Sequence, residues 1–127
     1  MKIINKKYFI NAPVRKVWDA LVNPKLIKEW SGSNAEMSDQ EGEGFKLWNG
    51  DIFGKNIQIV KHEKLVQEWS EKEWKTPSHL TFTLHPKNNG TQLVLVHENV
   101  PDSEFKSINN GWDEYYLGPL KNLVENS

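Results

Sequence analysis

The chain has no cysteine, no long apolar run and no excess of charge of either sign. Without cysteine it forms no disulfide bond and performs no thiolate chemistry, which is typical of proteins from a reducing compartment. No stretch approaches the roughly 20 apolar residues of a membrane-spanning helix, and the first residues lack the apolar core of a secretory signal. We therefore expect a cytoplasmic protein that does not act in a membrane.

Charge is nearly balanced, with 16 Lys and Arg, 17 Asp and Glu and a formal net charge of −1. Nucleic-acid binding requires a basic stripe or patch, whereas the lysines here are interspersed with glutamates. The histidines are not spaced like the ligand pairs of zinc sites, and the glycines of residues 41–44 have neither a following helix nor a lysine. The sequence thus predicts no nucleic-acid partner, no metal site and no cofactor.

The chain is rich in bulky aromatic residues, with six Trp and five Phe in 127 residues. This length suits a single domain, residues 1–127, with a core of its own. Period-two patterns predict strands over residues 3–10, 45–48, 52–61, 64–74, 80–85 and 91–98. Asn49-Gly50 predicts a two-residue hairpin, and Asn88–Gly90 predicts another turn. Consecutive hairpins imply an antiparallel sheet, and helices segregated from the strands imply an α+β fold.

Helical spacing appears in three places. We expect a helix that starts near Pro13 and buries Val17, Trp18 and Leu21, and a second short helix from Pro24 to about residue 29. The final quarter of the chain predicts one long amphipathic helix, whose buried stripe consists of Phe105, Ile108, Trp112, Tyr115, Tyr116, Leu120 and Val124.

Pro119 lies inside this final helix. There it removes a backbone hydrogen bond and clashes with the preceding turn, which costs about 3 kcal/mol or more in an unkinked helix. We expect a kink just before Pro119. It either lets the helix follow the curve of the sheet or shapes one mouth of a cavity.

Four segments resemble the activator of heat-shock protein 90 ATPase homologue family, specifically its C-terminal domain. They are Ile10–Leu21 (INAPVRKVWDAL), Phe45–Gly54 (FKLWNGDIFG), Gln67–Trp69 (QEW) and Gly111–Tyr116 (GWDEYY). The family is part of the SRPBCC superfamily of START- and Bet v 1-like proteins. The resemblance implies a helix-grip fold, in which a curved antiparallel sheet wraps around the long C-terminal helix and two short helices follow the first strand. It also implies a link to the stress response, with a heat-shock chaperone as one partner to consider.

A sheet that grips one helix can leave an apolar cavity between them, so the leading hypothesis is binding of a small apolar or amphipathic molecule. The aromatic residues either line such a cavity or fill an ordinary core. One alternative is a chaperone-associated protein. A second is a cyclase- or hydrolase-like enzyme that uses the same cavity.

The enzyme alternative depends on His97, which shares a strand face with Leu93 and Leu95 and should point inward. A buried imidazole needs a hydrogen-bond partner, either in the core or on a polar ligand. No carboxylate is placed beside it by the sequence, so we assign no catalytic residue. The residues expected to line the cavity are Trp30, Phe45, Leu47, Ile57, Trp69, Phe82, Leu93, Leu95, His97, Trp112, Tyr115 and Tyr116.

Overall fold

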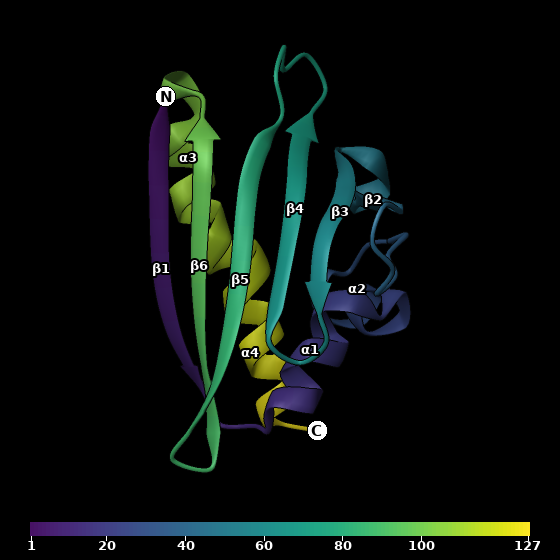
Figure 1. Cartoon of the computed structure of the whole chain (residues 1–127), viewed down its shortest axis with the longest axis vertical. Helices are drawn as coiled ribbons and strands as arrows, with labels where there is room; N and C mark the ends of the chain where they lie inside the picture. Colours follow the sequence, from purple (N-terminus) through teal and green to yellow (C-terminus); the bar gives the residue numbers. More distant parts are fainter.

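Six antiparallel strands form one sheet in the order β1-β6-β5-β4-β3-β2 (Figure 1). The structure is a computed structural model that describes all 127 residues. Hairpins join each strand from β2 to β6, and β6 also pairs with β1, so the first and last strands lie side by side. The strands are β1 (Lys2–Ile10), β2 (Gly44–Leu47), β3 (Ile52–Val60), β4 (Lys64–Glu71), β5 (Ser78–Lys87) and β6 (Gly90–Val100).

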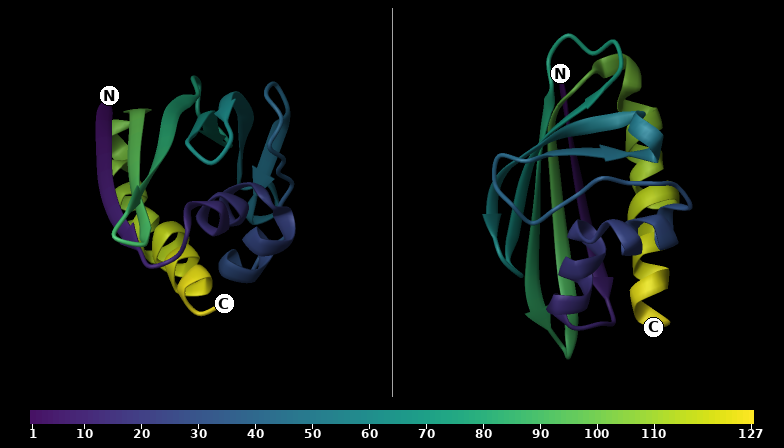
Figure 2. Two further views of the ribbon diagram at one scale, coloured as in Figure 1. Left: turned by 60° about the horizontal axis from the view of Figure 1, so that its bottom comes forward. Right: turned by 90° about the vertical axis from the view of Figure 1, so that its right-hand side faces the viewer.

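The helices cover one side of this curved sheet (Figure 2). The C-terminal helix runs along the sheet, and the two helices after β1 pack against its last part. Its successive parts are α3 (Phe105–Gly111), a π-helical turn (Trp112–Leu117) and α4 (Gly118–Glu125). The first two helices are α1 (Val14–Val22) and α2 (Pro24–Ser31). This arrangement confirms the α+β helix-grip fold predicted from the sequence.

Local sequence explains where α2 begins. The side chain of Asn23 accepts a hydrogen bond of 2.9 Å from the backbone N–H of Lys25, and Pro24 occupies the first turn, where its missing N–H leaves no bond unmade. The same Asn-Pro pair ends α1, because the residue before a proline avoids helical geometry. The predicted break between the two helices is therefore confirmed.

The hairpin between β2 and β3 differs from the prediction. Leu47 pairs with Ile52, so the connection has four residues rather than the two of Asn49-Gly50. Trp48 and Asn49 both have positive φ, 49° and 58°, within a short 3-10 turn. Asparagine tolerates this conformation, whereas for tryptophan it is unusual and costs backbone energy. The sequence predicted that the strand extends to Trp48, whereas in the structure β2 ends at Leu47.

The core lies between the concave face of the sheet and the helices. Leu80, Phe82 and Leu84 alternate inward along β5, as the sequence predicted, and meet Leu93 and Leu95 of the neighbouring strand. All five are almost completely buried. The helices close this face with further large side chains, among them Trp18, Trp30, Trp112, Tyr116 and Leu120.

The π-helical turn lies immediately before Gly118-Pro119, where the sequence predicted a kink. The N–H of Gly118 bonds to the carbonyl of Asp113, five residues earlier, which is the spacing of a π-helix. A Cβ atom on Gly118 would lie 2.3 Å from that carbonyl oxygen, so the turn requires glycine at this position. The widened turn accommodates Pro119 without a break in the helix.

Trp112 is 2% exposed and packs against the rings of Phe82, Trp69 and Tyr116. We expect Trp112→Ala to lower the free energy of unfolding by about 3–5 kcal/mol, because truncation leaves a large cavity among these rings. Tyr115 is the matched control. It was predicted to be buried but is 60% exposed, so Tyr115→Ala should cost about 1 kcal/mol or less. Chemical denaturation measures both, and equal midpoints for Trp112→Ala and the wild type would contradict this packing.

Candidate functional site

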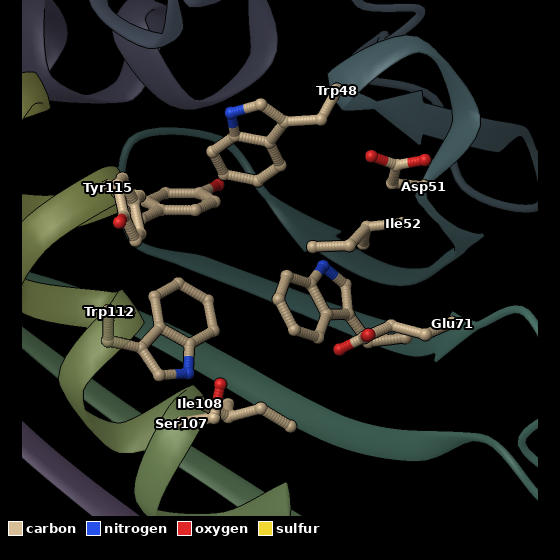
Figure 3. Close-up of a pocket in the computed structure, with 11 residues that line it drawn as sticks. Trp48, Asp51, Ile52, Glu71, Ser107, Ile108, Trp112 and Tyr115 are labelled. Atoms are coloured by element: carbon tan, nitrogen blue, oxygen red, sulfur yellow. The ribbon is translucent and has the colours of Figure 1, made fainter.

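A pocket of about 340 Å³ opens where the end of β4 and the β2–β3 turn face the C-terminal helix (Figure 3). Its size lies at the lower end of the range for small-molecule sites, about 300–1,000 Å³. The pocket is lined from the sheet side and from the helix side by Trp48, Asp51, Ile52, Trp69, Glu71, Ser107, Ile108, Gly111, Trp112, Tyr115 and Tyr116.

Aromatic rings form most of the pocket wall. Trp69 and Trp112 stack with their centroids 5.0 Å apart and their planes 20° apart. Tyr116 lies 4.6 Å from Trp112 and 6.1 Å from Trp48, measured between centroids. Tyr115 stands at the exposed rim. Such a wall offers large flat apolar surfaces and the negative faces of several π systems.

The π-helical turn determines which helix residues reach the pocket. Trp112, Tyr115 and Tyr116 all belong to this turn and all line the pocket. The carboxylate of Asp113, on the other side of the turn, accepts hydrogen bonds from Tyr8 Oη at 2.6 Å and Lys6 Nζ at 2.8 Å. These two bonds tie the π-helical turn to the edge strand β1. They therefore help to fix the position of the helical part of the aromatic wall.

Two carboxylates lie in the pocket wall on the side opposite Tyr115 (Figure 3). Asp51 belongs to the β2–β3 turn and is exposed, and Glu71 ends β4 and is partly buried. Burial raises the pKa of Glu71, and the negative charges of Glu104 and Asp51 raise it further. No Lys, Arg or His lines the pocket. This part of the site therefore carries uncompensated negative potential.

His97 lies next to the aromatic wall but is completely buried and does not reach the pocket. Its Nδ1 accepts a hydrogen bond from Trp112 Nε1 at 3.1 Å, and its Nε2 lies 2.7 Å from Ser78 Oγ. Ser78 Oγ in turn donates to the carbonyl oxygen of Trp69 at 2.7 Å. The imidazole thus connects both stacked tryptophans through hydrogen bonds.

These bonds assign the tautomer of His97. Because Nδ1 must accept from Trp112, the proton of the neutral ring is on Nε2 and is donated to Ser78. A serine nucleophile needs the opposite arrangement, in which the histidine accepts the hydroxyl proton. Ser78 is 1% exposed as well, so the Ser78–His97 pair serves the packing of the core.

The structure brings four of the twelve predicted cavity residues to the pocket: Trp69, Trp112, Tyr115 and Tyr116. Seven others are buried in the core behind it, namely Trp30, Phe45, Leu47, Phe82, Leu93, Leu95 and His97. Ile57 is 38% exposed and lies on neither the pocket nor the core. The deep space between sheet and helix is therefore filled by side chains, and the hollow is confined to one end of it.

Sequence reasoning missed seven residues as cavity residues: Trp48, Asp51, Ile52, Glu71, Ser107, Ile108 and Gly111. A signal existed for Glu71, which is two residues after Trp69 on the same strand and so shares its inward face. The residues of the β2–β3 turn gave no such signal, since alternation stops where a strand ends.

No group of three or more His, Cys, Asp or Glu side chains is close enough to hold a metal ion. No helix is both long and apolar enough to cross a bilayer.

The fold and the aromatic pocket together define a helix-grip domain of the START and Bet v 1 type. The profile of the family described as "Activator of Hsp90 ATPase homolog 1-like protein" matches residues 11–125. The chain therefore belongs to this family.

Relatives with similar sequences share about a quarter of the aligned residues with this chain. The human protein named activator of 90 kDa heat shock protein ATPase homolog 1 is 25% identical over 94% of this chain. An uncharacterised protein of Schizosaccharomyces pombe also shows 25% identity over 94% of the chain. The alignment covers 36% of each of these relatives, so the chain spans about a third of their length.

Solved structures of single domains match over nearly their whole length. A crystal structure described as an HSP90 activator from Plasmodium falciparum has a TM-score of 0.91 at 24% identity, covering 98% of this chain and 96% of that one. The solution structure of the Aha1 dimer from Colwellia psychrerythraea has a TM-score of 0.85 at 20% identity, covering 98% and 97%. At these identities the likeness establishes the fold.

The buried His97 predicts a pH dependence of stability. Burial lowers its pKa from 6.5 to about 4, so between these values the unfolded chain binds a proton that the folded protein does not. The free energy of unfolding should therefore fall by about 3 kcal/mol as the pH is lowered from about 6.5 to 4. Urea denaturation across this range measures the slope.

His97→Asn is the control for this slope, since its side-chain oxygen retains an acceptor near the position of Nδ1 but does not titrate. Whatever its stability at pH 7, this variant should show a flatter dependence between pH 6.5 and 4. An unchanged slope in His97→Asn would assign the effect to other groups.

Proposed function

We propose that this domain binds a small apolar or amphipathic molecule in the pocket between the β2–β3 turn, the end of β4 and the C-terminal helix. The observation that carries the proposal is the aromatic-walled hollow of about 340 Å³. Binding sites are typically concave and mostly apolar, with a few polar groups that orient the ligand. Here Ser107, Asp51, Glu71 and the hydroxyl of Tyr116 supply such groups.

The rigidity of the aromatic wall of the pocket supports the proposal that a ligand binds there. Trp69 and Trp112 are held by the bonds through Ser78 and His97, and the π-helical turn is tied to β1 by Asp113. A preformed wall loses little conformational entropy when a ligand binds.

Burial of about 250–350 Å² of apolar ligand surface contributes roughly 6–9 kcal/mol before the costs of association. The remaining free energy corresponds to micromolar affinity or weaker, about 8 kcal/mol or less.

Gly111 offers a direct test, because it lines the pocket in ordinary helical geometry, with φ −62° and ψ −34°. A Cβ there would meet only Tyr115 Cδ2, at 3.8 Å. Gly111→Leu should fill part of the pocket and weaken the binding of 1-octanol by about tenfold or more. Its melting temperature should not fall, since leucine favours the helix over glycine by about 0.5–1 kcal/mol.

The matched control is Asn110→Leu, which adds the same side chain to the neighbouring, exposed position. Tryptophan fluorescence during titration with 1-octanol measures both variants. We expect the control to bind as the wild type does. If wild-type fluorescence and melting temperature do not respond to 1-octanol at high micromolar concentration, the pocket is not a lipophile site.

A second candidate function is activation of the ATPase of heat-shock protein 90. It is favoured by the similarity, along nearly both whole chains, to the Plasmodium falciparum structure described as an HSP90 activator. The curated relatives with activator names, by contrast, are about three times as long as the matched region. This function needs an exposed contact surface rather than a pocket.

An ATPase assay with purified heat-shock protein 90 and an excess of this chain tests the second candidate. We expect little or no stimulation, because the surface is near neutral and its large exposed apolar residues are scattered over the N-terminus, β1, β3 and the C-terminal helix. The longer human activator serves as the positive control. A several-fold increase in turnover would make chaperone activation the leading function.

A further inference from the structure

We propose that the pocket prefers an organic cation with an apolar body, such as an alkylammonium ion, over neutral and anionic molecules of the same size. This inference rests on the proposed function, since it names the ligand class of the same pocket. Two independent features carry it. They are the ring of aromatic faces and the set of carboxylates without a cationic partner.

Aromatic rings line the pocket from three parts of the fold. Trp48, Trp69, Trp112, Tyr115 and Tyr116 contribute rings from the β2–β3 turn, from β4 and from the helix. A cation within about 6 Å of such a ring is attracted to its negative face, most strongly by tryptophan. Three tryptophans in one small wall therefore favour a positive ligand group.

The carboxylates have no cation of their own. Asp51 and Glu71 line the pocket, and Glu104 is near enough for its charge to act on Glu71. None of the three takes part in any of the four ion pairs of the protein, whereas Asp102 and Asp113 nearby are both paired. Burial raises the pKa of Glu71, and repulsion from the charges of Glu104 and Asp51 raises it further. A bound cation would relieve this repulsion.

The remaining groups fit an organic cation rather than a metal ion. These carboxylates do not belong to any group of three or more His, Cys, Asp or Glu side chains that could hold a metal ion. Tyr116 is 2% exposed, lines the pocket and has a hydroxyl with no partner in the protein, so it can accept a hydrogen bond from an ammonium N–H. An apolar tail would lie against Ile52 and Ile108.

Three probes with the same chain length test the preference: octylammonium, 1-octanol and octanoate. Calorimetric titration of the wild-type protein should give about tenfold tighter binding for the cation than for octanol, and weaker binding for octanoate than for octanol. Added salt should reduce the advantage of the cation.

The double variant Asp51→Asn with Glu71→Gln keeps the shape of the pocket but removes its charge. It should lose most of the preference for octylammonium and bind 1-octanol as the wild type does. The matched control, Asp39→Asn with Glu68→Gln, changes the net charge equally but outside the pocket, since Glu68 is on the opposite face of β4 from Glu71. We expect the control to retain the preference.

Equal affinity of the wild type for all three probes would overturn the charge preference and leave lipophile binding intact. Loss of the preference in the control double variant would also overturn it, because the effect would then come from net charge. If none of the probes binds, both this inference and the proposed lipophile site fail.

Discussion

The hydrogen bond from Trp112 Nε1 to His97 Nδ1 joins the C-terminal helix to strand β6 of the sheet, and the organisation of the site depends on it. The bond requires His97 to be neutral and to carry its proton on Nε2. That proton is donated to Ser78, whose own hydroxyl bonds to the backbone of Trp69. One directed chain of bonds thus sets the positions of both stacked tryptophans. Each atom of this chain of bonds has a partner, as a buried polar chain requires, whereas the indole N–H of Trp69 is buried without an acceptor.

The second constraint is the π-helical turn at Trp112–Leu117. Proline at position 119 cannot complete a regular helix, and glycine at 118 gives room for the Asp113 carbonyl that the wider turn displaces. The same turn presents Trp112, Tyr115 and Tyr116 to the pocket. The local irregularity that the Gly-Pro pair imposes on the helix is therefore also the feature that builds the helical wall of the site.

Membership of the activator family establishes the fold but does not determine the activity. The activity depends on the side chains of the site. Relatives at about a quarter identity share the sheet and the helix. This chain has an end pocket lined by aromatic rings and unpaired carboxylates, next to a core that is filled elsewhere. These side chains, rather than the fold, carry the proposals made for its ligand.

The sequence by itself determined the order of the elements, the inward faces of the strands and the family. Alternation along residues 80–85 and helical spacing from Trp112 to Val124 are local patterns that burial imposes directly. The tertiary structure alone decided where a hollow remains, because packing of the rings fills most of the space and leaves one end open. Trp48 and Asp51 entered the site through a turn whose left-handed backbone no periodicity reveals. The negative potential of the pocket likewise arises only when the fold brings together Asp51, Glu71 and Glu104, which are far apart in the sequence.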